Sequence, residues 1–232
     1  MVLFEQLQTG VEYQCQNILN LYDSPKCDRL ATQAAVGRHL RVFELPKNPA
    51  DSVYVCLCED DYLCWLSRSD INRLELAATN YQAIALNPTE ISTRLPKVIK
   101  FTHQAMQQPN YYLWGGTTAP NYDCSGLIQA AFADSGIWLP RDAYQQEAFT
   151  ESIPIEELLP GDLVFFGADK ATHVGLYLGS GFYIHSSGQE IGRNGIGIDS
   201  LTEQADPVSQ SYYRQFRCCG RVVKCYQPPS RG

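Results

Sequence analysis

The sequence lacks the features that would place it in a membrane or on nucleic acid. It contains no run of about 18 or more apolar residues, so no membrane-spanning helix is expected. Basic residues are the minority, because 18 lysines and arginines stand against 25 aspartates and glutamates, and the resulting net charge of −7 argues against a nucleic-acid surface. The N-terminus has no basic segment followed by an apolar one, as a secretory signal requires, and we therefore expect a cytoplasmic protein.

Paired cysteine motifs are also missing. The nine cysteines form no C-x-x-C pair, and neither cysteine cluster has a histidine at ligand spacing, so we expect no zinc site, no other metal and no cofactor. An odd number of cysteines in a reducing compartment predicts free thiols. No role is indicated for Cys218 or Cys219, and alternation with Val55 and Leu57 makes Cys56 and Cys58 packing residues.

What the sequence does contain is two differently patterned halves. Residues 1–75 read as short strands between turns, which predicts a small all-β barrel. Residues 76–92 are the predicted linker, where Pro88 and Pro96 are expected to interrupt any helix. Residues 93–232 contain helical patterns followed by strand patterns, which indicates an α+β domain. Within them, a helix is expected over residues 91–107 and strands over 162–166, 173–178, 182–185 and 216–225.

The first half resembles a bacterial SH3 domain. The matching segments are Leu19-Asn20-Leu21-Tyr22 with the turn Ser24-Pro25, and Cys64-Trp65-Leu66. Two positions depart from the family pattern, because Tyr22 replaces the usual arginine and Cys64 replaces a glycine. The resemblance implies a domain that binds or orients peptidoglycan-derived ligands, and a purely structural domain is the alternative.

Cys124 occupies the first position of a predicted helix in the second half. It follows a loop and precedes Leu127, Ile128 and Phe132, which have the one-sided spacing of a packed helix. The start of a helix carries unpaired N–H groups and the positive end of the helix dipole, which favour a nucleophilic thiolate. A buried structural cysteine is the alternative.

His173 and His185 are the histidines that could serve such a cysteine, because they fall on a predicted hairpin. If Gly179-Ser180-Gly181 is a three-residue loop, Leu178 faces Phe182 and the two histidines share a face of the sheet. A two-residue loop would shift the register by one and place them on opposite faces. His39 and His103 are expected to be surface residues.

The second half resembles the NlpC/P60 family of papain-like cysteine peptidases over about residues 91–225. Six segments occur in the family's order: Tyr112-Leu113-Trp114-Gly115-Gly116, Asp123-Cys124-Ser125-Gly126-Leu127, Leu139-Pro140-Arg141, residues 160–166 (PGDLVFF), His173-Val174-Gly175-Leu176-Tyr177 and His185-Ser186-Ser187-Gly188. The resemblance implies Cys124 as nucleophile, His173 as general base, His185 as the residue that orients His173, and Tyr112 beside the nucleophile.

The same resemblance implies contacts with a substrate. Asp123, Ser125 and Arg141 are candidate substrate-binding residues, with a helix cap and a surface charge as the structural alternatives. The family acts on bacterial cell-wall peptides, and an SH3-like domain ahead of the peptidase is typical of enzymes that process short turnover peptides with a free N-terminal L-alanine. Asp61 and Tyr62 are the residues of the first domain expected to meet such a peptide.

Two other functions stay open from the sequence. One is an amidase that cuts the sugar–peptide link, and the other is a non-catalytic protein that binds cell-wall fragments. The expected reaction is hydrolysis of the bond between γ-D-glutamate and a diamino acid. Neither the choice between diaminopimelate and lysine nor the oligomeric state is indicated.

Overall fold

The computed structural model describes residues 2–48, 51–203 and 205–229, which form two compact units. The first contains the chain up to Ile84 together with Trp114–Thr118 and the residues from Tyr226 onward. The second contains Ala85–Leu113 and Ala119–Cys225. Each unit has its own buried apolar core. In the described part of the chain, no helix is both long and apolar enough to cross a bilayer.

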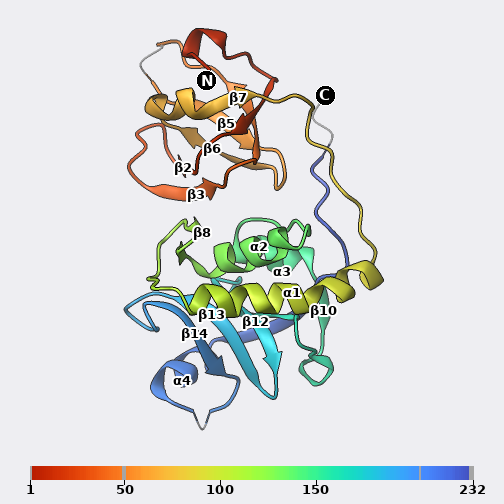
Figure 1. Ribbon diagram of the computed structural model, residues 1–232. Coiled ribbons are helices and arrows are strands. Elements are labelled where there is room, and N and C mark those ends of the chain that lie inside the picture. Colours follow the sequence, from red (N-terminus) through yellow and green to blue (C-terminus); the bar gives the residue numbers. More distant parts are fainter. Residues whose placement is uncertain (1, 49–50, 204, 230–232) are drawn as a thin grey trace. The chain divides into compact units, whose positions relative to one another are not determined.

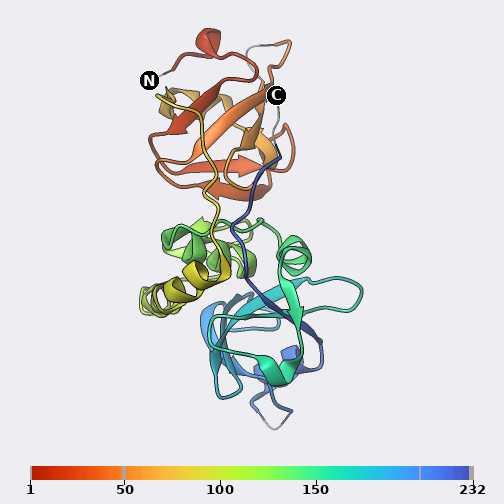
Figure 2. The same ribbon diagram turned by 90° about the vertical axis from the view of Figure 1, so that its right-hand side faces the viewer.

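The first unit is an antiparallel sheet of seven short strands that curls around a core of aliphatic side chains (Figures 1 and 2). Alternation explains its strands: Val53 and Val55 point into the core, whereas Tyr54 between them is partly exposed. The all-β fold expected for this half is confirmed. In the order β3-β2-β6-β5-β4-β1-β7, the strands are β1 Glu12–Cys15, β2 Leu19–Tyr22, β3 Leu30–Ala34, β4 His39–Glu44, β5 Val53–Leu57, β6 Tyr62–Leu66 and β7 Leu74–Leu76, with 3-10 turns at Phe4–Gln6 and Arg68–Arg73.

The second unit is an antiparallel sheet in the order β10-β15-β11-β12-β13-β14, with helices on both faces (Figure 1). This arrangement is α+β, as expected. The strands are β10 Glu151–Ile153, β11 Leu163–Phe166, β12 His173–Gly179, β13 Phe182–Ser187, β14 Gly195–Ser200 and β15 Phe216–Arg221; the helices are α1 Pro88–Met106, α2 Cys124–Asp134, α3 Ala143–Phe149 and α4 Pro207–Tyr213. A 3-10 turn spans Ile155–Glu157, and two short paired strands, β8 Thr117–Thr118 and β9 Asn121–Tyr122, precede α2.

Strand β11 shows how the two faces are covered. Leu163 and Phe165 pack with the cluster that contains α1 and α2, whereas Val164 and Phe166 pack with Tyr212 of α4. All four residues are buried, because a strand covered on both faces needs apolar residues at every position. The sheet therefore presents one face to α2 and the other to α4.

Helix α1 begins inside the predicted linker. Asn87 and Glu90 cap it reciprocally, since the Glu90 N–H donates to Asn87 Oδ1 at 3.0 Å and the Asn87 N–H donates to Glu90 Oε2 at 2.8 Å. Pro88 is the first helical residue, where the missing N–H costs no hydrogen bond. The helix also continues through Pro96. The helix predicted for residues 91–107 is confirmed, and the expectation that Pro88 and Pro96 interrupt any helix crossing the linker was wrong.

Candidate active site

Cys124 is the first residue of α2. The burial of this helix against the sheet fixes the position of Cys124. Leu127, Ile128 and Phe132 are fully buried against the sheet, which anchors the helix along its length. Asp123 caps the helix, because its Oδ1 accepts the Gly126 N–H at 2.7 Å. The Cys124 side chain is only 6% exposed. Its sulfur accepts hydrogen bonds from the backbone N–H groups of Ser125 and Val174, so the start of α2 meets the start of β12.

Asp123, Ser125 and Arg141 form a buried polar cluster beside the nucleophile. Arg141 Nη2 lies 2.6 Å from Asp123 Oδ2, and Arg141 Nη1 donates to Asp123 Oδ1 at 3.1 Å and to the Ser125 hydroxyl at 2.9 Å. Arg141 is 1% exposed, so the alternative of a surface charge was wrong. The bidentate ion pair fixes the cap of α2. Direct contact of these three residues with a substrate stays a prediction.

The β12–β13 hairpin has the two-residue loop of the second alternative, but a bulge gives it the same-face arrangement expected of the three-residue loop. Gly179 pairs with Phe182, so the loop has two residues, Ser180 and Gly181, whose positive φ values of 52° and 81° suit a tight hairpin turn. The predicted pairing of Leu178 with Phe182 was therefore wrong. A bulge between Tyr177 and Gly179 restores the register, because Tyr177 pairs with Tyr183. Both histidines contact Tyr212 of α4 and so share one face of the sheet, as the three-residue loop had predicted.

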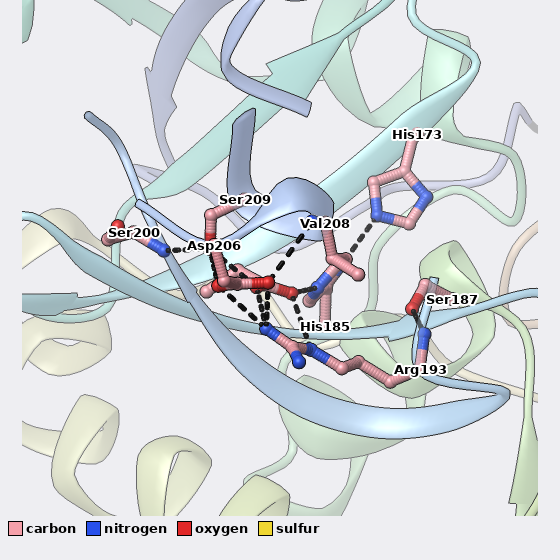
Figure 3. A network of polar contacts seen from close by, with 9 residues as sticks. His173, His185, Ser187, Arg193, Ser200, Asp206, Val208 and Ser209 are labelled. Atoms are coloured by element: carbon pink, nitrogen blue, oxygen red, sulfur yellow. Dashed lines mark hydrogen bonds and ion pairs between the residues drawn. The ribbon is translucent and has the colours of Figure 1, made fainter. Parts of the chain in front are cut away.

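His173, His185 and Asp199 form a continuous hydrogen-bonded chain across β12, β13 and β14. His173 Nε2 lies 2.6 Å from His185 Nδ1, and His185 Nε2 lies 2.6 Å from Asp199 Oδ2 (Figure 3). Because His173 uses Nε2 toward His185, its Nδ1 is the ring nitrogen that can accept a proton. His185 and Asp199 are almost completely buried. A thiol, a base and two further polar groups behind the base are the parts that nucleophilic catalysis requires.

Asp199 is the site residue that the sequence reasoning missed, together with the strand that carries it. Strand β14 pairs with β13 along its whole length, and Asp199 lies directly opposite Tyr183. The alternation of Gly195, Ile196, Gly197 and Ile198 was a usable strand signal. With β14 in place, Asp199 shares the face of His185, because His185 pairs with Gly197 and Asp199 lies two residues further along β14.

Burial governs the protonation of the catalytic pair. It raises the pKa of the Cys124 thiol to about 12, and the Asp123 charge adds to this, against the opposing effect of the two backbone N–H donors and of Arg141. Burial also lowers the pKa of His173 well below its ordinary value of 6.5, as does neighbouring His185, while Asp199 acts in the opposite direction. Both effects favour a neutral thiol and a neutral imidazole in the free protein. Desolvation thus opposes the thiolate expected at the helix start, which stays a prediction.

Two tyrosines lie near the thiol. Burial raises the pKa of Tyr112, and the proximity of Cys124 raises it further, so the Tyr112 hydroxyl keeps its proton. Tyr212 of α4 stacks on His173, with ring centroids 4.4 Å apart and an interplanar angle of 28°. Tyr112 was predicted at this place from the sequence, whereas Tyr212 was not, because its position in α4 has no motif to mark it.

Asp61 and Tyr62 belong to the first unit. Asp61 adopts a positive φ of 57° just before β6, and its carboxylate lies 3.4 Å from the Cys56 thiol. The neighbouring acids Glu59 and Asp60 are buried and share Arg38 as their ion-pair partner, at 3.1 Å and 2.8 Å. The contact of Asp61 and Tyr62 with a substrate stays a prediction.

The cysteines outside α2 form no metal-binding cluster in the described residues. All nine are free thiols, and no group of three or more cysteine, histidine or acidic side chains in those ranges could hold an ion. The polar groups gathered around Cys124 and His173 suit acyl transfer by the side chains themselves.

Comparisons with known proteins agree with the two-unit organisation. Residues 109–221 match the model of the NlpC/P60 family, and residues 21–71 match the model described as the bacterial dipeptidyl-peptidase Sh3 domain. A solved NlpC/P60 family protein from Bacillus cereus superposes with a TM-score of 0.50 at 22% identity, covering 92% of this chain and 64% of the other. At that identity, the likeness supports the fold.

Two curated relatives come from Bacillus subtilis. A γ-D-glutamyl-L-lysine dipeptidyl-peptidase is 33% identical over 119 residues, which are 50% of this chain and 36% of the relative. A bifunctional muramidase/DL-endopeptidase is 48% identical over 81 residues, which are 33% of this chain and 25% of the relative. The chain thus spans about a third or less of the length of either relative. In its own two units, the chain combines a bacterial SH3 domain with an NlpC/P60 domain that carries Cys124, His173 and His185.

Proposed function

We propose that the protein is a cysteine peptidase that hydrolyses the bond between γ-D-glutamate and a diamino acid in bacterial cell-wall peptides. The observation that carries this proposal is that the Cys124 sulfur, at the start of α2, accepts from the N–H of Val174, the residue next to His173, while His173 Nε2 lies 2.6 Å from His185 Nδ1. Such an arrangement serves acyl transfer with a thiol nucleophile. The bond is inferred from the activities after which the two relatives are named, a γ-D-glutamyl-L-lysine dipeptidyl-peptidase and a DL-endopeptidase.

The reaction begins from the neutral pair. As the Cys124 sulfur attacks the carbonyl carbon of the substrate amide, its proton moves to His173 Nδ1, and the carbonyl oxygen takes up the negative charge. N–H groups at the start of α2 and the Tyr112 hydroxyl stabilise that oxyanion. The proton on His173 then passes to the leaving amine, the carbon–nitrogen bond breaks, and a thioester to Cys124 remains. Tyr112 donates because its raised pKa keeps the hydroxyl protonated.

Water completes the cycle. His173 accepts a proton from a water molecule, the resulting hydroxide attacks the thioester, and the proton returns to the departing Cys124 sulfur. The products are a peptide that ends in D-glutamate, with its side-chain carboxylate free, and a free diamino acid or the peptide that begins with it. His185 accepts a hydrogen bond from His173 in both half-reactions, which holds the ring in one orientation.

The proposed substrates are short turnover peptides with a free N-terminal L-alanine, processed in the cytoplasm. Two observations support a requirement for a free N-terminus. One relative is named a dipeptidyl-peptidase, an enzyme class that releases dipeptides, and the first unit matches the SH3 model described for bacterial dipeptidyl-peptidases. A free ammonium in a partly desolvated site needs a countercharge.

Cleavage of the tripeptide L-Ala-γ-D-Glu-meso-diaminopimelate, followed by mass spectrometry of the products, tests the proposal. We expect L-Ala-D-Glu and free diaminopimelate, and no cleavage once the N-terminus is acetylated. Equal rates on the free and acetylated peptides would contradict the requirement for a free N-terminus while leaving the peptidase activity in place. A muropeptide cut between sugar and L-alanine would instead identify an amidase. The lysine tripeptide, run in parallel, decides which diamino acid is preferred.

A further inference from the structure

The hydrogen-bonded chain does not end at the second histidine. Asp199 accepts a hydrogen bond from His185 at one carboxylate oxygen, while its other oxygen, Oδ1, lies 2.5 Å from Arg193 Nη2 and accepts from the Ser209 hydroxyl at 2.6 Å (Figure 3). Arg193 Nη2 also contacts both oxygens of Asp206 at 3.0 Å. Asp199 is 2% exposed, and its carboxylate is therefore held from three sides inside the protein.

Helix α4 contributes to this chain at three places one turn apart. Asp206 caps the helix and pairs with Arg193, Ser209 donates to Asp199, and Tyr212 stacks on His173. Residues three apart lie on one side of a helix, so one face of α4 contacts the whole chain of polar groups. Ser209 and Tyr212 are buried, which leaves little freedom for either group to move.

Arg193 reaches Asp199 because Gly197 makes room for it. A Cβ atom on Gly197 would lie 2.8 Å from Arg193 Cγ and 3.4 Å from its Cβ and Cδ. The Arg193 stem therefore crosses β14 where that strand has no side chain. The Arg193 N–H also donates to the Ser187 hydroxyl at 2.8 Å, so this residue is fixed at its backbone as well as at its guanidinium.

An ionised Asp199 determines where the protons of both histidines lie. A carboxylate can only accept, so His185 must carry its proton on Nε2, and its Nδ1 must then accept. His173 in turn must carry its proton on Nε2 to donate to His185, which leaves the Nδ1 lone pair for the Cys124 proton. Besides Asp199, the groups that face His185 are His173 of β12, Tyr183 of its own strand and Tyr212 of α4. Arg193 lies behind Asp199 and balances its charge, and Arg193 pairs with Asp206 as well.

We propose that Asp199 is a positioning residue that selects the Nε2–H tautomer of His185 and His173, and that Arg193 and Ser209 hold its carboxylate in the orientation that does so. This inference rests on the proposed function, since the selected tautomer matters only if His173 accepts the Cys124 proton. Asp199 does not touch the substrate in this account, and it acts through the two histidines.

Asp199→Asn is the sharpest variant, because the asparagine amide can donate as well as accept. An N–H donated to His185 Nε2 moves the His185 proton to Nδ1, which forces His173 to present an N–H toward Cys124 instead of a lone pair. We expect kcat to fall on the order of 10²- to 10⁴-fold with little change in KM, as expected for a base held in the wrong tautomer. Arg193→Gln should lose part of the activity and Arg193→Lys should recover much of that loss, because lysine keeps one charged donor.

The matched control is Asp162→Asn. Asp162 is also buried and pairs with an arginine, since Arg221 Nε and Nη2 donate to it at 2.8 Å, but it contacts neither histidine. Both variants exchange a buried, arginine-paired carboxylate for an amide in the same unit. A loss of kcat common to both would mean that Asp199 serves stability alone, and would overturn the proposal.

Nitrogen-15 NMR of histidine-labelled protein reads the tautomers without any substrate. The chain has four histidines, so His39 and His103 can be assigned by single substitutions. We expect Nε2–H forms for His173 and His185 in the wild type and a different tautomer of His173 in Asp199→Asn. A wild-type His185 or His173 with its proton on Nδ1 would overturn the proposal even if the variant did not fold. Failure of the wild type to cleave the tripeptide would instead overturn the proposed function, with the tautomers unaffected.

Discussion

Replacing Arg141 by methionine is expected to destabilise the protein by about 3–5 kcal/mol, the usual cost of leaving one partner of a buried ion pair uncompensated. The structure favours this range over the much smaller cost of a surface pair, because the side chains of Arg141 and Asp123 are 2% and 9% exposed and solvent screens them little. For a protein of this size, such a loss lowers the melting temperature by roughly 6–20 °C. Arg141→Lys should cost less, because one charged hydrogen bond survives.

Thermal unfolding and steady-state kinetics of the same preparations measure this prediction. Because Asp123 caps α2 at Cys124, kcat should fall with the loss of the cap geometry while KM changes little. Lys97→Met is the matched control, since the Lys97–Asp134 pair is largely exposed and should contribute about 0–1 kcal/mol. An Arg141→Met protein with unchanged melting temperature and a raised KM would refute the reasoning and make Arg141 a substrate-binding residue.

Two further predictions concern the base and its strand. The acid limb of kcat/KM should lie below pH 6.5. Burial lowers the pKa of His173, and the imidazole stops acting as a base only when the pH falls below that lowered pKa. An acid limb above pH 6.5 in the pH profile would contradict a buried, neutral His173. Gly175→Ala should cost about 1–3 kcal/mol in urea unfolding and lower kcat, because the new Cβ would lie 2.6 Å from Tyr183 Cδ2, beside His185. Gly188→Ala, whose Cβ would lie 3.8 Å from Tyr112, should change neither value, and equal effects of the two variants would remove the steric explanation.

Local patterns predicted the parts of the site that depend on short stretches of chain. The apolar spacing after Cys124 predicted a packed helix, and the alternation around His173 and His185 predicted two strands joined by a tight turn. The same-face arrangement held although the loop was two residues long, because the bulge at Leu178 compensated for the missing residue. The alternation of apolar and polar residues does not reveal a bulge, because a bulge depends on how the two strands pack.

The missed features depend on groups that are distant in sequence or on burial. Asp199 joins the site only once β14 pairs with β13, and Ser209 and Tyr212 join it only once α4 packs on the sheet. Arg141 looked like a surface charge because its partner, Asp123, is 18 residues away in the chain. The opposing effect on the expected thiolate was hidden for a related reason: a helix start is visible in the sequence, whereas the desolvation that raises the pKa of Cys124 is a property of the folded core.

The central claim is that Cys124 attacks a γ-D-glutamyl amide with the help of His173. Product analysis of L-Ala-γ-D-Glu-meso-diaminopimelate with the wild type, Cys124→Ala and Cys219→Ala tests it most directly, because Cys219 is also buried but lies on β15, which pairs with neither histidine strand. The account predicts diaminopimelate release by the wild type and by Cys219→Ala, and none by a folded Cys124→Ala. Release of diaminopimelate by Cys124→Ala at the wild-type rate, or an intact tripeptide with the wild type, would contradict it.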